Sequence, residues 1–292
     1  MPKFTNKSSG FLLIDKPVGW TSFDVCGRLR KTLAIKRVGH TGTLDPFATG
    51  LLVVAFGKAT KMIPFLDKAS KTYVAKILLG KTSETLDTES EIETLTTDFD
   101  ISVEQVSDIM TNHFSGKIQQ IPPKYSALKV GGKKMCDLVR AGKEVEVKPR
   151  ATEILNWKVL SVNNDEKSVE LELEVAAGFY VRSFARDLGL KIAGGGLCSQ
   201  LRRTRVGNLL VSQALEVESV DKNQTLVDPV DILTNFFKYV INKSRVNDFM
   251  AGRAFPIVET VENGTKVLVI CDNKTVGMAE IVDDKLQPRI VF

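Results

Sequence analysis

The sequence has 292 residues and a formal net charge of +5, with 43% hydrophobic and 26% charged residues. These values are ordinary for a globular protein, and the length allows one large domain and one small one. No apolar run is long enough to span a membrane or to form the core of a signal peptide, so we expect a cytoplasmic protein. The modest basic excess permits binding to nucleic acid without requiring it.

Charge is unevenly distributed along the chain. Residues 84–108 contain nine acids and no Lys or Arg, whereas residues 124–150 contain eight basic residues and three acids. We expect the acidic run to be a solvated surface, and we interpret the basic run as a face that can meet phosphate groups.

The sequence offers no pattern for a cofactor. Its four cysteines are far apart and only two histidines accompany them, which argues against a zinc site and against a disulfide framework. Two Gly-Lys pairs, at Gly57 and Gly80, lack the upstream glycine of a phosphate-binding loop. We therefore expect neither a metal nor a nucleotide cofactor.

The first predicted elements are a strand and a helix. Residues 1–9 are polar and expected to be disordered, residues 10–14 form an apolar strand, and residues 15–20 form a turn. Ser22 is expected to cap a helix with one basic face. Its apolar positions recur at helical spacing and are Phe23, Cys26, Leu29 and Leu33.

Residues 39–50 form the central motif, Gly-His-Thr-Gly-Thr-Leu-Asp-Pro-Phe-Ala-Thr-Gly. Three glycines and a proline exclude a plain helix or strand, and Pro46 biases Asp45 away from the helical region. The apolar run at 51–56 anchors this loop as a buried strand. A carboxylate on such a loop can serve as a nucleophile or a general base. The alternative is a simple turn whose carboxylate binds nearby amides.

Strand and helix signals continue through the middle of the chain. Residues 72–80 alternate as a strand with Tyr73 on the apolar face, where a tyrosine is more often a core residue. Ser102 and Gln105 predict a capped helix that reaches Phe114.

Residues 115–150 combine basic charge with extended chain. Pro122-Pro123 forces an extended conformation, Gly131-Gly132 adds a hinge, and a short helix is expected at 133–141. This segment could clamp a phosphate backbone, and the alternative is an ordinary surface loop.

The last third of the chain begins with two strands, at 154–162 and 168–175, and then a helix that begins at Arg182. At that position the guanidinium could reach a carboxylate on a neighbouring loop. Three arginines within residues 202–205 predict a phosphate-facing patch. Residues 245–292 contain short strands separated by turns, which is typical of a small β-rich domain.

These motifs resemble, in the same order, those of the TruB-type pseudouridine synthases. The resemblance covers most of residues 10–210. It rests on Asp15-Lys16-Pro17, Gly39-His40-Thr41-Gly42-Thr43-Leu44-Asp45-Pro46, Lys71-Thr72-Tyr73, Gln120-Ile121-Pro122-Pro123-Lys124-Tyr125-Ser126-Ala127-Leu128-Lys129, Tyr180-Val181-Arg182-Ser183 and Leu201-Arg202-Arg203-Thr204. One departure is the triple glycine at 194–196, where relatives often carry an apolar stretch with a histidine.

The resemblance implies a fold and a domain organisation. The fold is mixed α/β (α+β), a pseudouridine synthase fold with a large, mainly antiparallel sheet. Residues 1–240 would form the catalytic domain, in which residues 115–150 are an RNA-clamping thumb. Residues 241–292 would form a small PUA-like domain, for which the alternative is a cap that stabilises the catalytic domain.

The resemblance also implies a reaction: isomerisation of a uridine to pseudouridine in the T-loop (position 55) of tRNA, by base flipping and covalent catalysis. Asp45 would be the nucleophile, with attack on the ribose or on the base left open. Arg182 would keep Asp45 ionised, and Tyr73 would stack on the base and help to take the C5 proton. The isomerisation needs no metal or redox cofactor.

Other residues are expected to bind the substrate. His40 would occupy the space left by the flipped nucleotide, Leu201 would pack beside the base, and Lys16 would support the catalytic loop. The remaining expected contacts to the tRNA T-arm stem-loop are Arg202, Arg203, Lys124 and Lys129.

Two other classes of function are considered. A tRNA-folding chaperone would use the same basic surfaces and could be an additional activity. A hydrolase with paired carboxylates is rejected, because residues 35–65 contain no acid besides Asp45. We expect a monomer, since no heptad or dimerisation helix is apparent.

Overall fold

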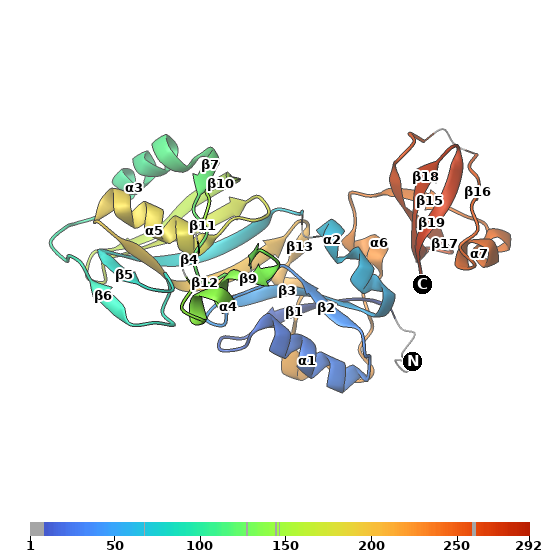
Figure 1. Ribbon diagram of the computed structural model, residues 1–292, viewed down its shortest axis with the longest axis horizontal. Helices are drawn as coiled ribbons and strands as arrows, with labels where there is room; N and C mark the ends of the chain where they lie inside the picture. Colours follow the sequence, from blue (N-terminus) through green and yellow to red (C-terminus); the bar gives the residue numbers. More distant parts are fainter. Residues whose placement is uncertain (1–8, 67, 127, 144, 146, 259–260) are drawn as a thin grey trace. The chain divides into compact units, whose positions relative to one another are not determined.

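Figure 1 shows the computed structural model, which describes residues 9–66, 68–126, 128–143, 145, 147–258 and 261–292. The chain forms two compact units, Met1–Pro46 with Gly50–Lys68 and Asn208–Phe292, and Phe47–Thr49 with Ala69–Gly207. Disorder is expected for residues 1–9. Residues 1–8 lie outside the described residues, so the prediction is not tested there. The predicted domain boundary at residue 240 stays a prediction.

The N-terminal part of the first unit contains a small sheet covered by a helix. Strand β1 (Gly10–Lys16) pairs with β3 (Thr49–Phe56) in antiparallel fashion and with β14 (Leu215–Glu216) in parallel, and β2 (Val38–Thr41) pairs with the other edge of β3. Apolar side chains of α1 (Ser22–Leu33) pack on β1 and β3. The remaining short elements of this part are α2 (Ile63–Leu66), β13 (Leu209–Leu210) and α6 (Pro229–Ile232).

The beginning of α1 differs from the prediction by one residue. Thr21, not Ser22, is the N-cap, because its side chain accepts a hydrogen bond from the amide of Asp24 while the Asp24 carboxylate accepts one from the amide of Thr21. Phe23 is 70% exposed, and Val25 is buried on the core side. The shift leaves Ser22 buried and able to serve a different purpose, described below.

The C-terminal part of the first unit is a separate five-stranded sheet in the order β15-β17-β18-β19-β16. Its elements are β15 (Phe237–Val240), α7 (Lys243–Met250), β16 (Phe255–Pro256), β17 (Lys266–Cys271), β18 (Lys274–Val282) and β19 (Lys285–Val291). Phe249 of α7 is fully buried among the apolar side chains of this sheet. The β-rich character predicted for the end of the chain is confirmed.

The second unit contains a five-stranded antiparallel array in the order β12-β4-β11-β10-β7. Its strands are β4 (Lys71–Leu79), β7 (Gly116–Gln120), β10 (Arg150–Asn163), β11 (Ser168–Val175) and β12 (Gly196–Val206). Alternate residues of β4 are buried, which puts Tyr73 on the core face as the period predicts. The mixed α/β fold with a large, mainly antiparallel sheet is confirmed.

Helices and short hairpins complete the second unit. Helix α5 (Val181–Ile192) packs against β12 and β4 (Figure 1). Ser102 caps α3 (Val103–Ile109), which continues as a π-helical turn to Phe114, as expected. The other elements are β5 (Lys81–Ser83), β6 (Ile92–Thr94), β8 (Lys129–Val130), β9 (Lys133–Lys134) and α4 (Met135–Arg140). No helix among the described residues has both the length and the apolar character needed to cross a membrane.

Two glycines, Gly189 and Gly196, let α5 approach the start of β12 at backbone distance. A Cβ atom added to Gly189 would lie 2.2 Å from the carbonyl oxygen of Gly195, and one added to Gly196 would lie 2.4 Å from that of Ala185. The Gly195 carbonyl in turn accepts a hydrogen bond from the amide of Gly80 at 2.9 Å. Gly196 of the triple glycine therefore has a packing role: together with Gly189, it allows the close approach of α5 to the start of β12.

Replacing Gly189 by alanine is expected to destabilise the protein by about 1–3 kcal/mol or more, because the added methyl group overlaps a backbone that has no room to move. Gly27→Ala is the matched control, since Gly27 is also in a helix and a Cβ there meets no atom within 4 Å. That control is expected to be neutral or to stabilise by up to about 1 kcal/mol. Urea unfolding of both variants measures the difference, and equal stabilities would contradict the packing role.

Candidate active site

The loop that carries Asp45 is held at one end by the side chain of Lys16, which is fully buried. Its Nζ donates hydrogen bonds to the carbonyl oxygens of Trp20 at 2.6 Å, Pro17 at 2.9 Å and Pro46 at 3.3 Å. The Pro46 carbonyl also accepts a hydrogen bond from the amide of Gly19 at 2.8 Å. The residue that follows Asp45 is thus fixed to the turn after β1, and the role predicted for Lys16 in supporting a catalytic loop stays a prediction.

The residue that precedes Asp45 is fixed by Ser22. The Ser22 Oγ accepts a hydrogen bond from the amide of Leu44 at 2.9 Å and lies 3.2 Å from its carbonyl oxygen, to which it donates. Sequence reasoning missed this role, because a serine at the start of a helix is first interpreted as a cap. The two contacts place Asp45 between two anchored neighbours, which limits the positions open to its carboxylate.

His40 lies on β2 of the same unit, opposite Val54 of β3, and is half-buried. It therefore sits on a strand that leads directly into the Asp45 loop. Its predicted role in filling the space of a flipped nucleotide stays a prediction.

In the second unit, Tyr73 and two predicted substrate contacts share one face of the sheet. Tyr73 on β4 lies directly opposite Arg203 on β12, and Leu201 lies opposite Ala75. Directly opposed residues of paired strands point to the same face. Arg203 is 1% exposed, Leu201 7% and Tyr73 9%.

The arginines of the 202–205 segment do not form the single phosphate-facing patch that the sequence predicts. Arg203 is buried, Arg202 is half-buried with Nη1 at 3.4 Å from Thr49 Oγ1, and only Arg205 is exposed. Arg202 and Arg203 are neighbours on the strand, so their side chains point to opposite faces. A register irregularity between Arg203 and Arg205 then places Arg205 opposite Thr72, on the other face from Arg203 and Tyr73. A run of like charges on a strand is therefore divided between core and surface.

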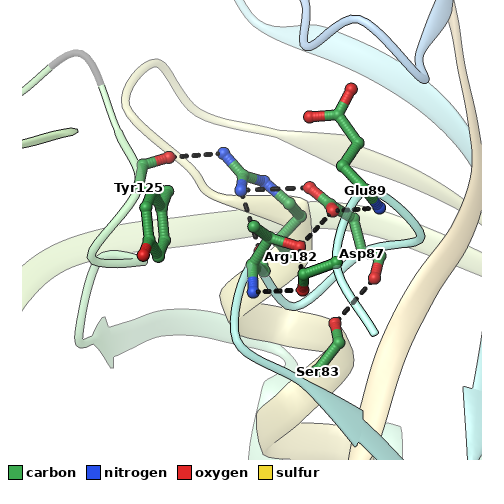
Figure 2. Close-up of polar contacts among 7 residues, drawn as sticks. Ser83, Asp87, Glu89, Tyr125 and Arg182 are labelled. Atoms are coloured by element: carbon green, nitrogen blue, oxygen red, sulfur yellow. Dashed lines mark hydrogen bonds and ion pairs between the residues drawn. The ribbon is translucent and has the colours of Figure 1, made fainter. Parts of the chain in front are cut away.

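Arg182 lies in the first turn of α5 and is the centre of a buried polar network (Figure 2). Its Nη1 donates to the Asp87 carboxylate at 3.1 Å and to the Thr85 carbonyl at 2.9 Å, and its Nη2 donates to the Tyr125 carbonyl at 2.9 Å. The Arg182 side chain is 8% exposed and that of Asp87 is fully buried. Burial of the pair is tolerable because each charge has a charged partner and further hydrogen bonds.

Asp87 is the functional candidate that sequence reasoning missed. Its carboxylate accepts a hydrogen bond from the amide of Glu89 at 2.9 Å and one from the hydroxyl of Thr85, while the Ser83 hydroxyl donates to its carbonyl at 2.6 Å (Figure 2). The expectation that residues 84–108 are only a solvated surface is wrong at this position. No sequence signal distinguishes Asp87 from the other eight acidic residues of the 84–108 segment, which are exposed.

The remaining predicted contacts lie in the thumb, residues 115–150. Lys124 is exposed, and Lys129 begins β8. The prediction that Arg182 pairs with Asp45 stays a prediction, since the two residues belong to different units. Among the described residues, no group of three or more His, Cys, Asp or Glu side chains is placed to hold a metal ion.

Solved structures share this fold. A chain in the structure of an H/ACA RNP bound to a substrate RNA containing 2′-deoxyuridine matches with a TM-score of 0.73 at 21% identity, over 98% of this chain and 86% of that chain. A chain in a Cbf5-Nop10-Gar1 complex matches with a TM-score of 0.70 at 23% identity, over 97% and 84%. These likenesses show the fold, which is the pseudouridine synthase fold implied by the motifs.

Sequence comparison then gives the family. The model described as TruB family pseudouridylate synthase (N terminal domain) matches residues 30–181. The tRNA pseudouridine synthase B of Aquifex aeolicus (strain VF5) is 35% identical over 287 residues, which cover 96% of this chain and 98% of the relative. That of Endomicrobium trichonymphae is 39% identical over 227 residues, 78% of this chain and 97% of the relative. The chain belongs to the TruB family of pseudouridylate synthases.

Asp87→Ala is expected to destabilise the protein by about 3–5 kcal/mol, because it leaves the buried guanidinium of Arg182 without a counter-charge. Asp87→Asn keeps an acceptor in place and should cost less. Asp100→Ala is the control, since the ion pair of Asp100 with Lys167 has an 86% exposed carboxylate and should contribute less than about 1 kcal/mol. Denaturant unfolding orders the three variants, and a loss for Asp87→Ala no larger than the control would contradict the network.

Proposed function

We propose that the protein isomerises a uridine of tRNA to pseudouridine at position 55 of the T-loop, with Asp45 as the nucleophile. The observation that carries the proposal is the fixation of both neighbours of Asp45, by Ser22 at Leu44 and by Lys16 and Gly19 at Pro46. A pre-positioned carboxylate is what covalent group transfer needs. Relatives that match 96% and 78% of this chain are named tRNA pseudouridine synthase B, which supports tRNA as the substrate.

The reaction makes three demands on the site. The uridine must leave its stack and enter a pocket, because the reacting atoms are hidden in a folded RNA loop. The bond between N1 and the ribose C1′ must then break and a bond from C5 to C1′ must form. Finally, the proton on C5 must leave and N1 must gain one. Asp45 would hold one fragment covalently while the base rotates, and attack on the ribose or on the base are both compatible with this role.

The other residues would support this chemistry. Arg182 would keep Asp45 ionised, since a nearby cation lowers the pKa of a carboxylate. Tyr73 and Leu201 would hold the base from the apolar face of the sheet, and Tyr73 would help to remove the C5 proton. His40 would fill the space that the flipped nucleotide leaves.

RNA binding would use the surfaces outside the core. Lys124 and Lys129 of the thumb and Arg202 would contact the T-arm. Arg203 would act from within, beside Tyr73, because its burial removes it from the phosphate-facing surface. We further propose that the protein works in the cytoplasm as a monomer.

Asp45→Asn is expected to abolish tritium release from C5-labelled uridine in a T-arm stem-loop, a loss of at least about 10³-fold, because the amide cannot act as a nucleophile. Binding of the same RNA should remain within about threefold. Asp165→Asn, at an exposed turn between β10 and β11, is the control and should keep full activity.

Release by Asp45→Asn at the wild-type rate would remove Asp45 from the role. If the wild type binds the stem-loop but releases no tritium, the isomerisation of this uridine is refuted, and an RNA-folding activity measured by refolding of unmodified tRNA becomes the next candidate.

A further inference from the structure

The start of the thumb, residues 120–125, is fastened to the beginning of α5. The side-chain amide of Gln120 donates to the carbonyl of Tyr180 at 3.2 Å and accepts from the amide of Tyr180 at 3.0 Å. The carbonyl of Ile121 accepts from the Ser183 hydroxyl at 2.8 Å and from Arg186 Nη2 at 3.2 Å. These contacts hold backbone to helix, and none of them involves the guanidinium of Arg182.

Tyr125 is attached differently. Its carbonyl accepts from Arg182 Nη2 at 2.9 Å, and its hydroxyl donates to the Glu84 carboxylate at 2.7 Å. Glu84 directly precedes Thr85, whose carbonyl accepts from Arg182 Nη1 at 2.9 Å. Tyr125 thus contacts Arg182 through its carbonyl (Figure 2) and, through its hydroxyl, the loop whose Thr85 carbonyl binds the other outer nitrogen of the same guanidinium.

A guanidinium is a rigid planar fork, so its orientation is set only when both of its outer nitrogens are held. Asp87 and Thr85 hold Nη1, and the backbone of Tyr125 holds Nη2. The side chain of the same residue is held by the hydrogen bond to Glu84. This bond also raises the pKa of the Tyr125 hydroxyl above its usual value, because the hydroxyl proton is shared with the Glu84 carboxylate.

The geometry points to Tyr125 as a positioning residue that, together with Glu84, fixes the orientation of Arg182 and couples it to the RNA-binding thumb. The inference rests on the proposed function, in which Arg182 acts on Asp45. It assigns Tyr125 no contact with the reacting atoms. A thumb that shifts on binding RNA would move an acceptor of Arg182 with it.

Single-turnover isomerisation and RNA binding test this role on the whole 292-residue chain. Tyr125→Phe removes one hydroxyl and is expected to lower the rate constant about tenfold while the Kd for the T-arm stem-loop stays within about twofold. Glu84→Ala should do the same. The double variant should be no slower than either single one, because both changes break the same hydrogen bond.

Ser183→Ala is the matched control. It also removes one hydroxyl that holds the thumb, at the carbonyl of Ile121, but it does not touch Tyr125 or the guanidinium of Arg182. Its rate should remain within about twofold of the wild type. An equal loss in Ser183→Ala, additive losses in the double variant, or a loss in Tyr125→Phe confined to Kd would overturn the positioning role.

Hydrogen exchange separates this inference from the reaction itself. Amides in residues 83–89 are expected to exchange faster in Tyr125→Phe than in the wild type and to be unchanged in Ser183→Ala, with no RNA present. If the wild type fails to isomerise the RNA, the proposed function falls, and the exchange result still decides the contact. Identical exchange in wild type and Tyr125→Phe would refute it.

Discussion

The second unit depends on the burial of one ion pair, between Arg182 and Asp87. Taking two charges out of water costs several kcal/mol for each, so the surrounding structure must satisfy the remaining donors and acceptors. It does so with backbone groups: the carbonyls of Thr85 and Tyr125 receive the guanidinium, and the amide of Glu89 binds the carboxylate. A helix, an irregular loop and the start of the thumb consequently meet at one side chain.

The loop of Asp45 in the first unit is also held by a buried charge whose hydrogen bonds are satisfied by backbone groups. The buried ammonium group of Lys16 is received by three carbonyls, and a buried hydroxyl binds both backbone groups of Leu44. Contacts of this kind fix the backbone on both sides of Asp45. In the proposed reaction this anchoring would matter, because a misplacement of about 1 Å can cost about 10² in rate.

Much of the fold could be predicted from the sequence, because apolar residues recur at the spacing of strands or helices. The alternation of residues 72–80, the capping pair of Ser102 and Gln105, and the strands at 154–162 and 168–175 all match observed elements. The motifs also led to Lys16 and Arg182, which the structure places in networks of contacts. The errors have physical causes: a cap moved by one residue at Thr21, and a strand that divides its arginines between two faces.

Asp87 could not have been found in this way. Asp87 can be buried because it pairs with Arg182, 95 residues further along the chain. A single sequence does not show that these two residues are in contact. The same holds for Ser22, whose hydroxyl is used by a loop that follows 22 residues later. Local pattern predicts elements, but long-range hydrogen bonds decide which polar residues matter.

The glycine contact between α5 and β12 has a mechanical consequence for Arg182. Gly189 lies seven residues from Arg182 on the same helix. At a rise of about 1.5 Å per residue, the glycine contact is about 10 Å from the Cα atom of Arg182. A tilt of about 5° at this contact displaces that atom by about 1 Å. At Gly189 and Gly196 the backbones of helix and strand are in contact, so no side chain can adjust its conformation there to accommodate such a tilt. The absence of side chains at Gly189 and Gly196 therefore helps to set where the other end of α5, with Arg182, is placed.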